Sequence, residues 1–186
     1  MKIWHSEAEF NFRASAVALG MFDGVHIGHQ ALIRRARALA DELDAACVVC
    51  TFDRHPLSVI RPERAPVQLL TMAEKLEKMA KMGVDGVLLH AFTPEFAAIE
   101  AKDYLERLTE GLRVKAVVAG FNYSFGAGGR GNAEMIRREA ARLGYVAGIV
   151  DAVRDGSDAV SSTLIRELMA GGDQVRAARL LRLENG

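Results

Sequence analysis

Two histidines separated by an isoleucine and a glycine form the segment with the clearest chemical potential in this sequence. His26 and His29 lie between an apolar run at 14–19 and a stretch whose leucines and alanines recur three and four residues apart. This spacing predicts a strand followed by a helix, with both imidazoles at the helix N-terminus. A helix N-terminus attracts phosphate, and imidazoles donate hydrogen bonds to phosphoryl oxygens as negative charge builds on them.

Glycines in the same segment favour a close approach of the backbone to a ligand. Gly20 and Gly24 precede the first histidine, and Gly28 lies between the two histidines. The absence of a side chain at these positions leaves room for a bound group. The alternative is a glycine-rich turn with two incidental histidines, which the position directly before an amphipathic helix disfavours.

This segment resembles the Gly-x-Phe-Asp-Gly-x-His-x-Gly-His signature of nucleotidyltransferases that transfer an adenylyl or cytidylyl group. With Phe-Asp-Gly before the first histidine, it is most similar to the FMN adenylyltransferase module of bacterial bifunctional riboflavin kinase/FAD synthetases. The resemblance implies that His26 and His29 are catalytic. It also implies an ATP-binding loop formed by Gly20, Met21, Phe22, Asp23 and Gly24.

A second segment of phosphate-binding type lies near the end of the chain, at 161–166. Hydroxyl groups open a predicted helix there, and an arginine follows one turn later. Such a set suits phosphate, whereas ordinary helix capping is the alternative. The segment resembles the Ser-Ser-Thr-x-Ile-Arg motif of the same family. The resemblance implies that Ser161, Ser162 and Thr163 bind ATP and that Arg166 is catalytic, holding the pyrophosphate as it leaves.

Two further segments follow predicted strands and resemble flavin-type motifs of this family. The segment 51–56 resembles Thr-Phe-x-Pro-His-Pro, with Arg54 in place of the usual proline, and 120–126 resembles Gly-x-Asp/Asn-Phe-x-Phe-Gly. The resemblance implies that Asn122 helps to place ATP or its metal. Arg54 either reaches the phosphate of FMN or indicates a different acceptor. Flavin contacts are implied for Phe52, His55, Pro56 and Phe125.

The run Gly126–Gly131 satisfies Gly-x-Gly-x-x-Gly, and Asp151 follows it at the spacing of a dinucleotide fingerprint. We reject that interpretation because a true fingerprint begins directly after its strand, whereas the predicted strand here ends well before Gly126. The alternative is a loop that brings Arg130 close to a phosphate of ATP. The sequence also contains no Gly-x-x-x-x-Gly-Lys-Ser/Thr segment, so a P-loop is not predicted.

The composition limits the class of protein. The 186 residues are 50% hydrophobic and 26% charged, which is typical of one soluble domain. The 24 basic and 24 acidic residues give no net charge, which argues against binding to nucleic acid or to a membrane surface. No signal-peptide stretch or membrane span is evident, so we expect a cytoplasmic protein.

The two cysteines form a Cys-x-x-Cys pattern within the apolar run 45–52. This run predicts a buried strand, in which cysteine behaves as a small hydrophobic residue. Cys47 and Cys50 would then point to opposite faces of the sheet, and no second pair exists to complete a zinc site. We therefore expect neither redox chemistry nor metal binding at these residues.

Strand and helix patterns alternate along the chain, which predicts an α/β fold with a Rossmann-like parallel sheet and helices on both faces. After this core, a short strand ending near Val160 and two helices are expected, and the proline-containing segment 53–70 is expected to be a long ordered loop. Right-handed crossovers would bring the strand ends to one edge. Strands are predicted at 15–19, 46–52, 84–91, 114–119 and 145–150, and helices at about 27–43, 72–82, 101–111 and 132–143.

The resemblance covers about residues 1–182 and implies adenylyl transfer from ATP to FMN, giving FAD and pyrophosphate. Mg²⁺ would arrive with ATP and take few protein ligands, so no dedicated metal site is expected. Family members continue into a riboflavin kinase domain that is absent from this chain. We therefore expect a single domain over 1–186, either a stand-alone enzyme or a fragment, and the sequence leaves open whether a separate riboflavin kinase supplies the FMN.

Two alternatives stay open at this point. One is a transferase of the same superfamily that uses CTP or another acceptor. The other is a non-catalytic protein that binds flavin or nucleotide. The sequence predicts no oligomeric state.

Overall fold

A six-stranded parallel sheet forms the centre of the computed structural model, which describes residues 1–183. The strand order is β1-β4-β3-β2-β5-β8, and every neighbouring pair is parallel. The predicted α/β class is therefore confirmed. The strands are β1 (Lys2–Trp4), β2 (Ser15–Leu19), β3 (Ala46–Phe52), β4 (Gly86–His90), β5 (Val114–Gly120) and β8 (Val146–Val150).

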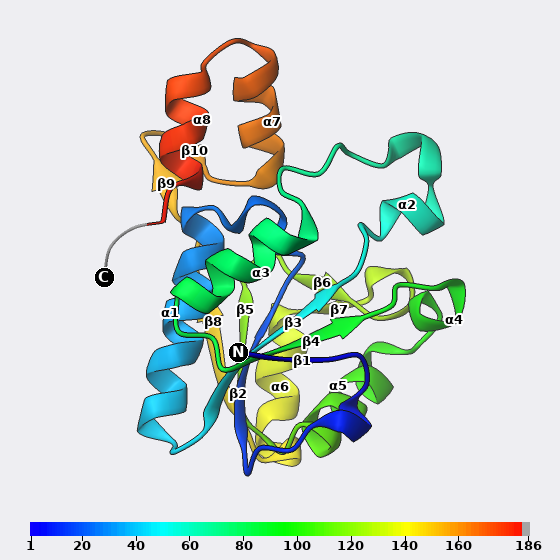
Figure 1. The fold of residues 1–186 in the computed structure, drawn as a ribbon. Coiled ribbons are helices and arrows are strands. Elements are labelled where there is room, and N and C mark those ends of the chain that lie inside the picture. The colour runs from blue at the N-terminus through cyan, green and yellow to red at the C-terminus, as the bar shows by residue number, and fades with distance from the viewer. Residues whose placement is uncertain (184–186) are drawn as a thin grey trace.

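Helices cover both faces of this sheet. Helices α1 and α3 pack on one face, α5 and α6 pack on the other, and α7 and α8 stand beyond the N-terminal end of α1 (Figure 1). The α-helices are α1 (Ile27–Glu42), α2 (Leu57–Ile60), α3 (Met72–Lys81), α4 (Pro94–Ala97), α5 (Ala101–Gly111), α6 (Ala133–Leu143), α7 (Ser162–Ala170) and α8 (Gln174–Leu181).

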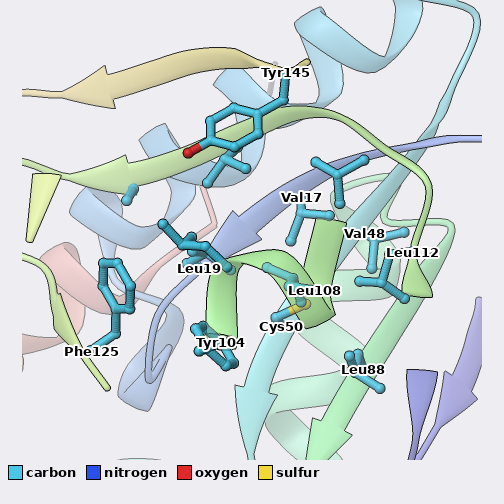
Figure 2. Close-up of a cluster of buried hydrophobic side chains, with 14 of the residues drawn as sticks. Val17, Leu19, Val48, Cys50, Leu88, Tyr104, Leu108, Leu112, Phe125 and Tyr145 are labelled. Carbon is cyan, nitrogen blue, oxygen red and sulfur yellow. The ribbon is translucent and has the colours of Figure 1, made fainter. Parts of the chain in front are cut away.

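The alternation of side chains along the buried strands creates two apolar layers. In β2, Val17 and Leu19 point toward α5 and α6, into the cluster drawn in Figure 2. Ala16 and Ala18 point the other way, toward α1 and α3. All five residues of β2 are buried, as expected for a central parallel strand, and their burial supplies much of the driving force for folding.

The cysteines confirm this two-layer arrangement. Cys47 lies in the layer beneath α1, and Cys50 lies in the layer beneath α5. Both thiols are free and buried. Burial raises the pKa of Cys47 to about 12 and that of Cys50 well above its usual value, so neither is a thiolate near neutral pH.

The strand order reverses at β2, and such a reversal is a usual position for a ligand in this type of sheet. From β2 the chain builds outward through β3 and β4, and it later returns to the other side of β2 to form β5 and β8. The carboxyl ends of β2 and β5 lie side by side, and the chain runs from β2 to α1 on one face of the sheet and from β5 to α6 on the other face. Ligands of open α/β sheets bind in the crevice outside such a switch point.

Short elements account for the differences from the sequence predictions. The edge strand β1 was not predicted, because three residues carry too little periodic signal. The segment 53–70 was predicted as a loop, but it contains α2 and a 3₁₀ turn at Pro62–Arg64. The hairpin β6–β7 (Ser124–Phe125 with Gly131–Asn132) was not predicted. Of the hairpin β9–β10 (Arg154–Asp155 with Asp158–Ala159), the second strand corresponds to the short strand expected to end near Val160, and its partner was not predicted.

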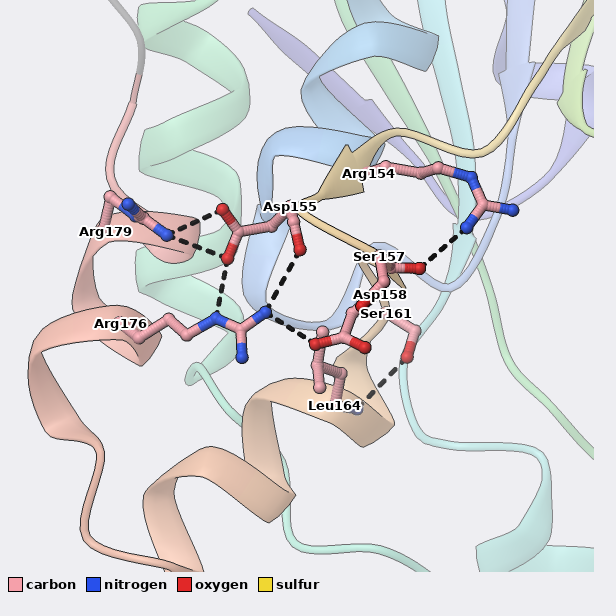
Figure 3. A network of polar contacts seen from close by, with 8 residues as sticks. All are labelled: Arg154, Asp155, Ser157, Asp158, Ser161, Leu164, Arg176 and Arg179. Carbon is pink, nitrogen blue, oxygen red and sulfur yellow. Dashed lines mark hydrogen bonds and ion pairs between the residues drawn. The ribbon is translucent and has the colours of Figure 1, made fainter.

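The last two helices form a small unit with its own support. Ile165, Ala177 and Leu180 make a separate buried cluster. Arg176 donates to Asp155 and to Asp158 at 2.7 Å each, so the guanidinium joins α8 to the β9–β10 hairpin (Figure 3). Ion pairs and three buried side chains, rather than the main sheet, hold this unit together.

Candidate active site

A tight turn carries the chain from β2 into α1 and holds the first motif. Phe22 adopts a left-handed conformation with φ of 52°, and Gly24 has φ of 85°. A Cβ atom on Gly24 would lie 2.9 Å from the side chain of Leu181 in α8, so a larger residue there would displace either the turn or the helix. Glycine is required at this position for both its conformation and its size.

His26 caps helix α1 with its own ring. Its Nδ1 atom accepts a hydrogen bond from the backbone N–H of His29 at 3.3 Å, and the two rings stack with centroids 3.7 Å apart. Because Nδ1 accepts, neutral His26 carries its proton on Nε2, which leaves that N–H for another acceptor. Gly28 permits the stack, since a Cβ atom there would come within 3.1 Å of the His26 ring.

Both imidazoles are neutral at physiological pH. Burial lowers the pKa of His26 to about 4, and burial together with His26 and Lys75 lowers the pKa of His29 well below its usual value. The Nδ1 atom of His29 is buried with no hydrogen-bond partner among residues 1–183. An unsatisfied buried polar atom is costly, and this one is enclosed by the protein rather than open to solvent.

The two phosphate-type motifs meet through Asp23. The Oδ2 atom of Asp23 pairs with the guanidinium of Arg166, and its Oδ1 atom accepts from the Leu69 N–H at 2.9 Å. Arg166 Nε donates to the Val67 carbonyl at 2.7 Å. Ser162 Oγ donates to the Asp23 carbonyl at 2.9 Å. The structure therefore brings residues 23 and 162–166 together at the N-terminus of α1.

The other hydroxyls of the second motif have different surroundings. Ser161 caps α7, because its Oγ atom accepts from the Leu164 N–H at 3.1 Å (Figure 3). This is the capping role that the sequence left open as an alternative. Thr163 is exposed on the first turn of α7.

A pocket lies next to these motifs and contains much of the flavin-type segment. Phe52 contributes a ring that packs edge-on against Phe92 and Phe96 at centroid distances of 5.1 and 5.3 Å. His55 Nδ1 accepts from the Leu57 N–H at 3.1 Å, while Pro56 begins α2. The lining residues are Met21, Asp23, Phe52, Arg54, His55, Gln68, Leu70, Met72 and Lys75.

Arg54, the departure from the family pattern, lies at the rim of this pocket. Its guanidinium is largely exposed and pairs with the neighbouring Asp53 at 2.9 Å. Asp53 in turn accepts from the Phe92 N–H at 3.0 Å. The arginine therefore has its own counter-ion at the rim of the pocket.

Sequence reasoning missed Lys75, a buried residue of this pocket. Its Nζ atom donates to the Met21 carbonyl at 2.6 Å and to Thr51 Oγ1 at 2.7 Å. It lies on the buried face of α3 with Met79, four residues on. A lysine within an apolar helical stripe is a signal that could have identified it, since lysine is seldom buried without a partner.

Three predicted ligand contacts lie elsewhere, and none of them is among the described residues that line the pocket. Phe125 is buried in the sheet layer shown in Figure 2, with its ring 5.8 Å from that of Tyr104. Asn122 is exposed in the turn after β5. Arg130 is exposed and pairs with Glu100.

The acidic residues of the described chain do not gather into a metal centre. Within residues 1–183, no group of three or more His, Cys, Asp or Glu side chains is placed to hold an ion. Asp23 is the carboxylate in the pocket lining. Nor does any helix in this part of the chain combine the length and apolarity needed to cross a membrane.

Comparisons with known proteins identify the family of this chain. Residues 9–164 match the FAD synthetase family. A bifunctional riboflavin kinase/FMN adenylyltransferase from Listeria monocytogenes is 40% identical over 166 residues, covering 89% of this chain and 52% of that protein. The protein of the same name from Escherichia coli is 30% identical over 178 residues, covering 95% and 57%. The chain thus spans about half the length of these curated relatives.

Solved structures support the fold. One described as a macrolide-efflux protein from Streptococcus pneumoniae has a TM-score of 0.85 at 29% identity, over 96% of this chain and 59% of that one. A pantoate–beta-alanine ligase from Francisella tularensis has a TM-score of 0.60 at 14% identity, over 99% and 80%, and shows a shared fold alone. With the family match over most of its length, the chain belongs to the FAD synthetase family.

Proposed function

We propose that this chain transfers the adenylyl group of ATP to FMN, giving FAD and pyrophosphate. A terminal phosphate oxygen of FMN attacks the α-phosphorus of ATP, the new P–O bond forms in line with the bond to pyrophosphate, and pyrophosphate leaves with that electron pair. The phosphate of FMN is already largely ionised near pH 7, so no strong general base is needed. Catalysis then consists of positioning and charge stabilisation.

The observation that carries this proposal is the stacked pair His26–His29 at the N-terminus of α1. His26 offers its Nε2–H to a phosphoryl oxygen, and the α1 N-terminus adds its partial positive charge. Both rings are neutral before ATP binds, and an anion beside them raises their pKa values. Charge on the α-phosphate is therefore met by donors that need little reorganisation.

Arg166 and Ser162 would hold the β- and γ-phosphates. In the structure, Asp23 neutralises the Arg166 guanidinium. A triphosphate competes with Asp23 for that cation, since charge-assisted bonds to phosphate are strong. Binding of ATP would therefore loosen the Asp23–Arg166 pair and free a carboxylate oxygen.

Mg²⁺ fits this arrangement as a companion of ATP. It prefers oxygen ligands and commonly binds through one or two carboxylates and the substrate phosphates. Asp23 is the pocket carboxylate that would contact it, directly or through a bound water. When bound, the ion supplies charge neutralisation of the phosphates.

The chain would depend on a riboflavin kinase activity for its FMN, since curated relatives of about twice its length carry both names. No segment of the present structure is assigned to that activity. We treat residues 1–186 as one adenylyltransferase domain.

Formation of FAD tests the proposal directly. Purified protein is incubated with FMN, ATP and Mg²⁺, and the flavins are separated by chromatography. Parallel reactions contain CTP in place of ATP, or riboflavin in place of FMN. FAD formed only from FMN and ATP supports the proposal, whereas a folded, ATP-binding protein that forms no FAD contradicts it.

A further inference from the structure

Helix α3 places a lysine inside the fold, beside the turn that carries the histidines. The side chain of Lys75 is buried, with 6% of the residue exposed. Its ammonium group donates to the Met21 carbonyl at the end of β2 and to Thr51 Oγ1 near the end of β3. These bonds use two of its three N–H groups and fix the nitrogen at the pocket wall.

The partners of this ammonium group are neutral. A buried cation is costly unless an opposite charge compensates it. Among residues 1–183, no carboxylate forms an ion pair with Lys75: Asp23 acts on it electrostatically, but the Asp23 oxygens are bonded to Arg166 and to the Leu69 N–H. Burial accordingly lowers the pKa of Lys75 to about 8.

A second cation at the same pocket shows the contrast. Arg54 also contributes to the lining, but Asp53 neutralises it and most of its side chain is in solvent. Lys75 is enclosed and lacks such a partner in the described chain. The pocket therefore offers a fixed positive charge to an anion that enters it.

We propose that Lys75 binds the phosphate group of the flavin acceptor, an inference that rests on the proposed adenylyl transfer. Its third N–H is available to a phosphate oxygen in the pocket. Thr51, its hydroxyl partner, begins the flavin-type segment, and Phe52 and His55 of that segment line the same pocket. These neighbours favour the acceptor over ATP as the source of the phosphate.

Two flavins that differ in one phosphate provide the test. FMN and riboflavin are titrated separately into the wild-type protein and into Lys75→Met, and Mg-ATP is titrated as a third ligand. We expect Lys75→Met to lose FMN affinity by roughly 10- to 100-fold, the worth of one charge-assisted bond. Riboflavin and Mg-ATP affinities should change by less than about threefold.

Lys81→Met is the matched control. Lys81 lies on the same helix, is exposed, and pairs with Glu77 at 2.6 Å. It should leave all three affinities unchanged. Equal losses of FMN and riboflavin affinity in Lys75→Met would indicate a structural role, a loss confined to Mg-ATP would assign the lysine to the nucleotide, and no loss would remove it from binding. Each of these three results overturns the inference.

A pH titration keeps the inference testable if Lys75→Met does not fold. The preference of wild-type protein for FMN over riboflavin should decline between about pH 8 and 10, as the ammonium loses its proton. Lys75→Arg should keep that preference, because guanidinium stays charged. A wild-type preference that is constant over this range, or one that declines equally in Lys75→Arg, contradicts the inference.

The other charged groups near this ammonium do not produce the same signal. Asp23, His29, His55 and Arg54 face it from the turn, from α1 and from the segment after β3. Burial lowers the pKa values of both imidazoles, so they are already neutral at pH 8. Asp53 raises the pKa of Arg54, which stays charged. Lys78 on α3 has a lowered pKa and also titrates at high pH, but Lys75→Arg leaves it unchanged.

The two proposals fail separately. If FAD forms and Lys75→Met keeps the wild-type preference for FMN, the inference alone is wrong. If the lysine governs the flavin preference as expected but no FAD forms, the proposed function alone is wrong.

Discussion

Helices α1 and α7 both present their N-termini to the candidate site, yet they are held there in different ways. Helix α1 has sixteen residues and buries six of them against the sheet. Helix α7 has nine residues, and Ile165 is its one buried residue in the described chain. The histidines on α1 are neutral and enclosed, whereas Arg166 on α7 is charged and paired with Asp23.

This difference indicates that the N-termini of α1 and α7 have different roles at the candidate site. The α1 side is a fixed surface whose donors are set by packing. The α7 side has a small apolar cluster and the ion pair between Arg166 and Asp23, and we expect a phosphate to replace that ion pair, because ion pairs exchange partners at lower cost than a packed core rearranges. The following predictions test that difference, starting with the largest expected effect.

Replacement of the first histidine should affect the reaction most. His26→Asn keeps a residue able to cap α1 but removes the imidazole donor. We expect FAD formation to slow by a factor on the order of 100 to 1000, as for loss of one oxyanion-type donor. Turnover is measured at saturating FMN and ATP, with the exposed His5→Asn as control. Near-normal turnover in His26→Asn would remove this ring from the chemistry.

Arg166→Met should act mainly on nucleotide affinity. Loss of one charge-assisted contact corresponds to roughly a 10- to 100-fold weaker binding of Mg-ATP. Calorimetric titration of Mg-ATP measures the effect. Arg179→Met, an exposed arginine that pairs with Asp155, is the control. If Mg-ATP binds Arg166→Met as tightly as it binds wild type, α7 contributes no triphosphate contact.

The pH dependence of stability should separate the two regions. The folded-state pKa of His26 is about 4, below its unfolded value near 6.5, so the unfolded chain binds the extra proton between these values. The contribution of His26 to stability should therefore be constant above pH 6.5 and should fall by up to about 1.4 kcal/mol per pH unit toward pH 4. Urea unfolding at a series of pH values measures this slope.

His26→Asn should reduce that slope, to which His29, His55 and His90 also contribute, and an unchanged slope would show that the His26 ring is not neutral in the folded protein. The α7–α8 unit should respond at lower pH. Arg176 and Arg179 hold the pKa of Asp155 below its usual value, so their contribution is present above pH 4 and is lost as pH falls further.

Arg176→Met should give the smallest global effect. It removes the guanidinium that joins α8 to the β9–β10 hairpin, far from the packed layers of the sheet. We expect faster proteolytic cleavage within α7 and α8, with a thermal midpoint of the whole domain shifted by less than about 2 °C. A large fall in the midpoint would mean that the last two helices are part of the main cooperative unit.

The sequence predicted the elements whose signal is long and periodic. Five strands of the central sheet and the four helices between them were expected within a few residues, because the apolar runs and the helical spacing follow from which side chains the sheet must bury. The edge strand β1 and the two-residue hairpins depend on pairing between distant backbone segments, and no local pattern encodes such pairing.

The candidate site was predictable where chemistry lies within one segment. His26 and His29 could be read from their spacing, and their stack follows from it. The contact between Asp23 and Arg166 joins residues far apart in sequence, and the burial of Lys75 depends on how α3 packs against β2 and β3. Phe125 lies in the buried cluster under α5, since an aromatic side chain suits a core as well as a ligand site, and its contact with flavin stays a prediction.

Chemical labelling of the two cysteines would measure how often each helix layer separates from the sheet. Cys47 and Cys50 lie on opposite faces of β3. Cys47 is buried under α1, and Cys50 is buried under α5. An alkylating reagent reaches either sulfur only when that layer separates from the sheet, because the protonated buried thiol does not react. The relative labelling rates of the two positions would reveal whether the layers detach independently or together, and whether ligands at the strand ends slow one more than the other.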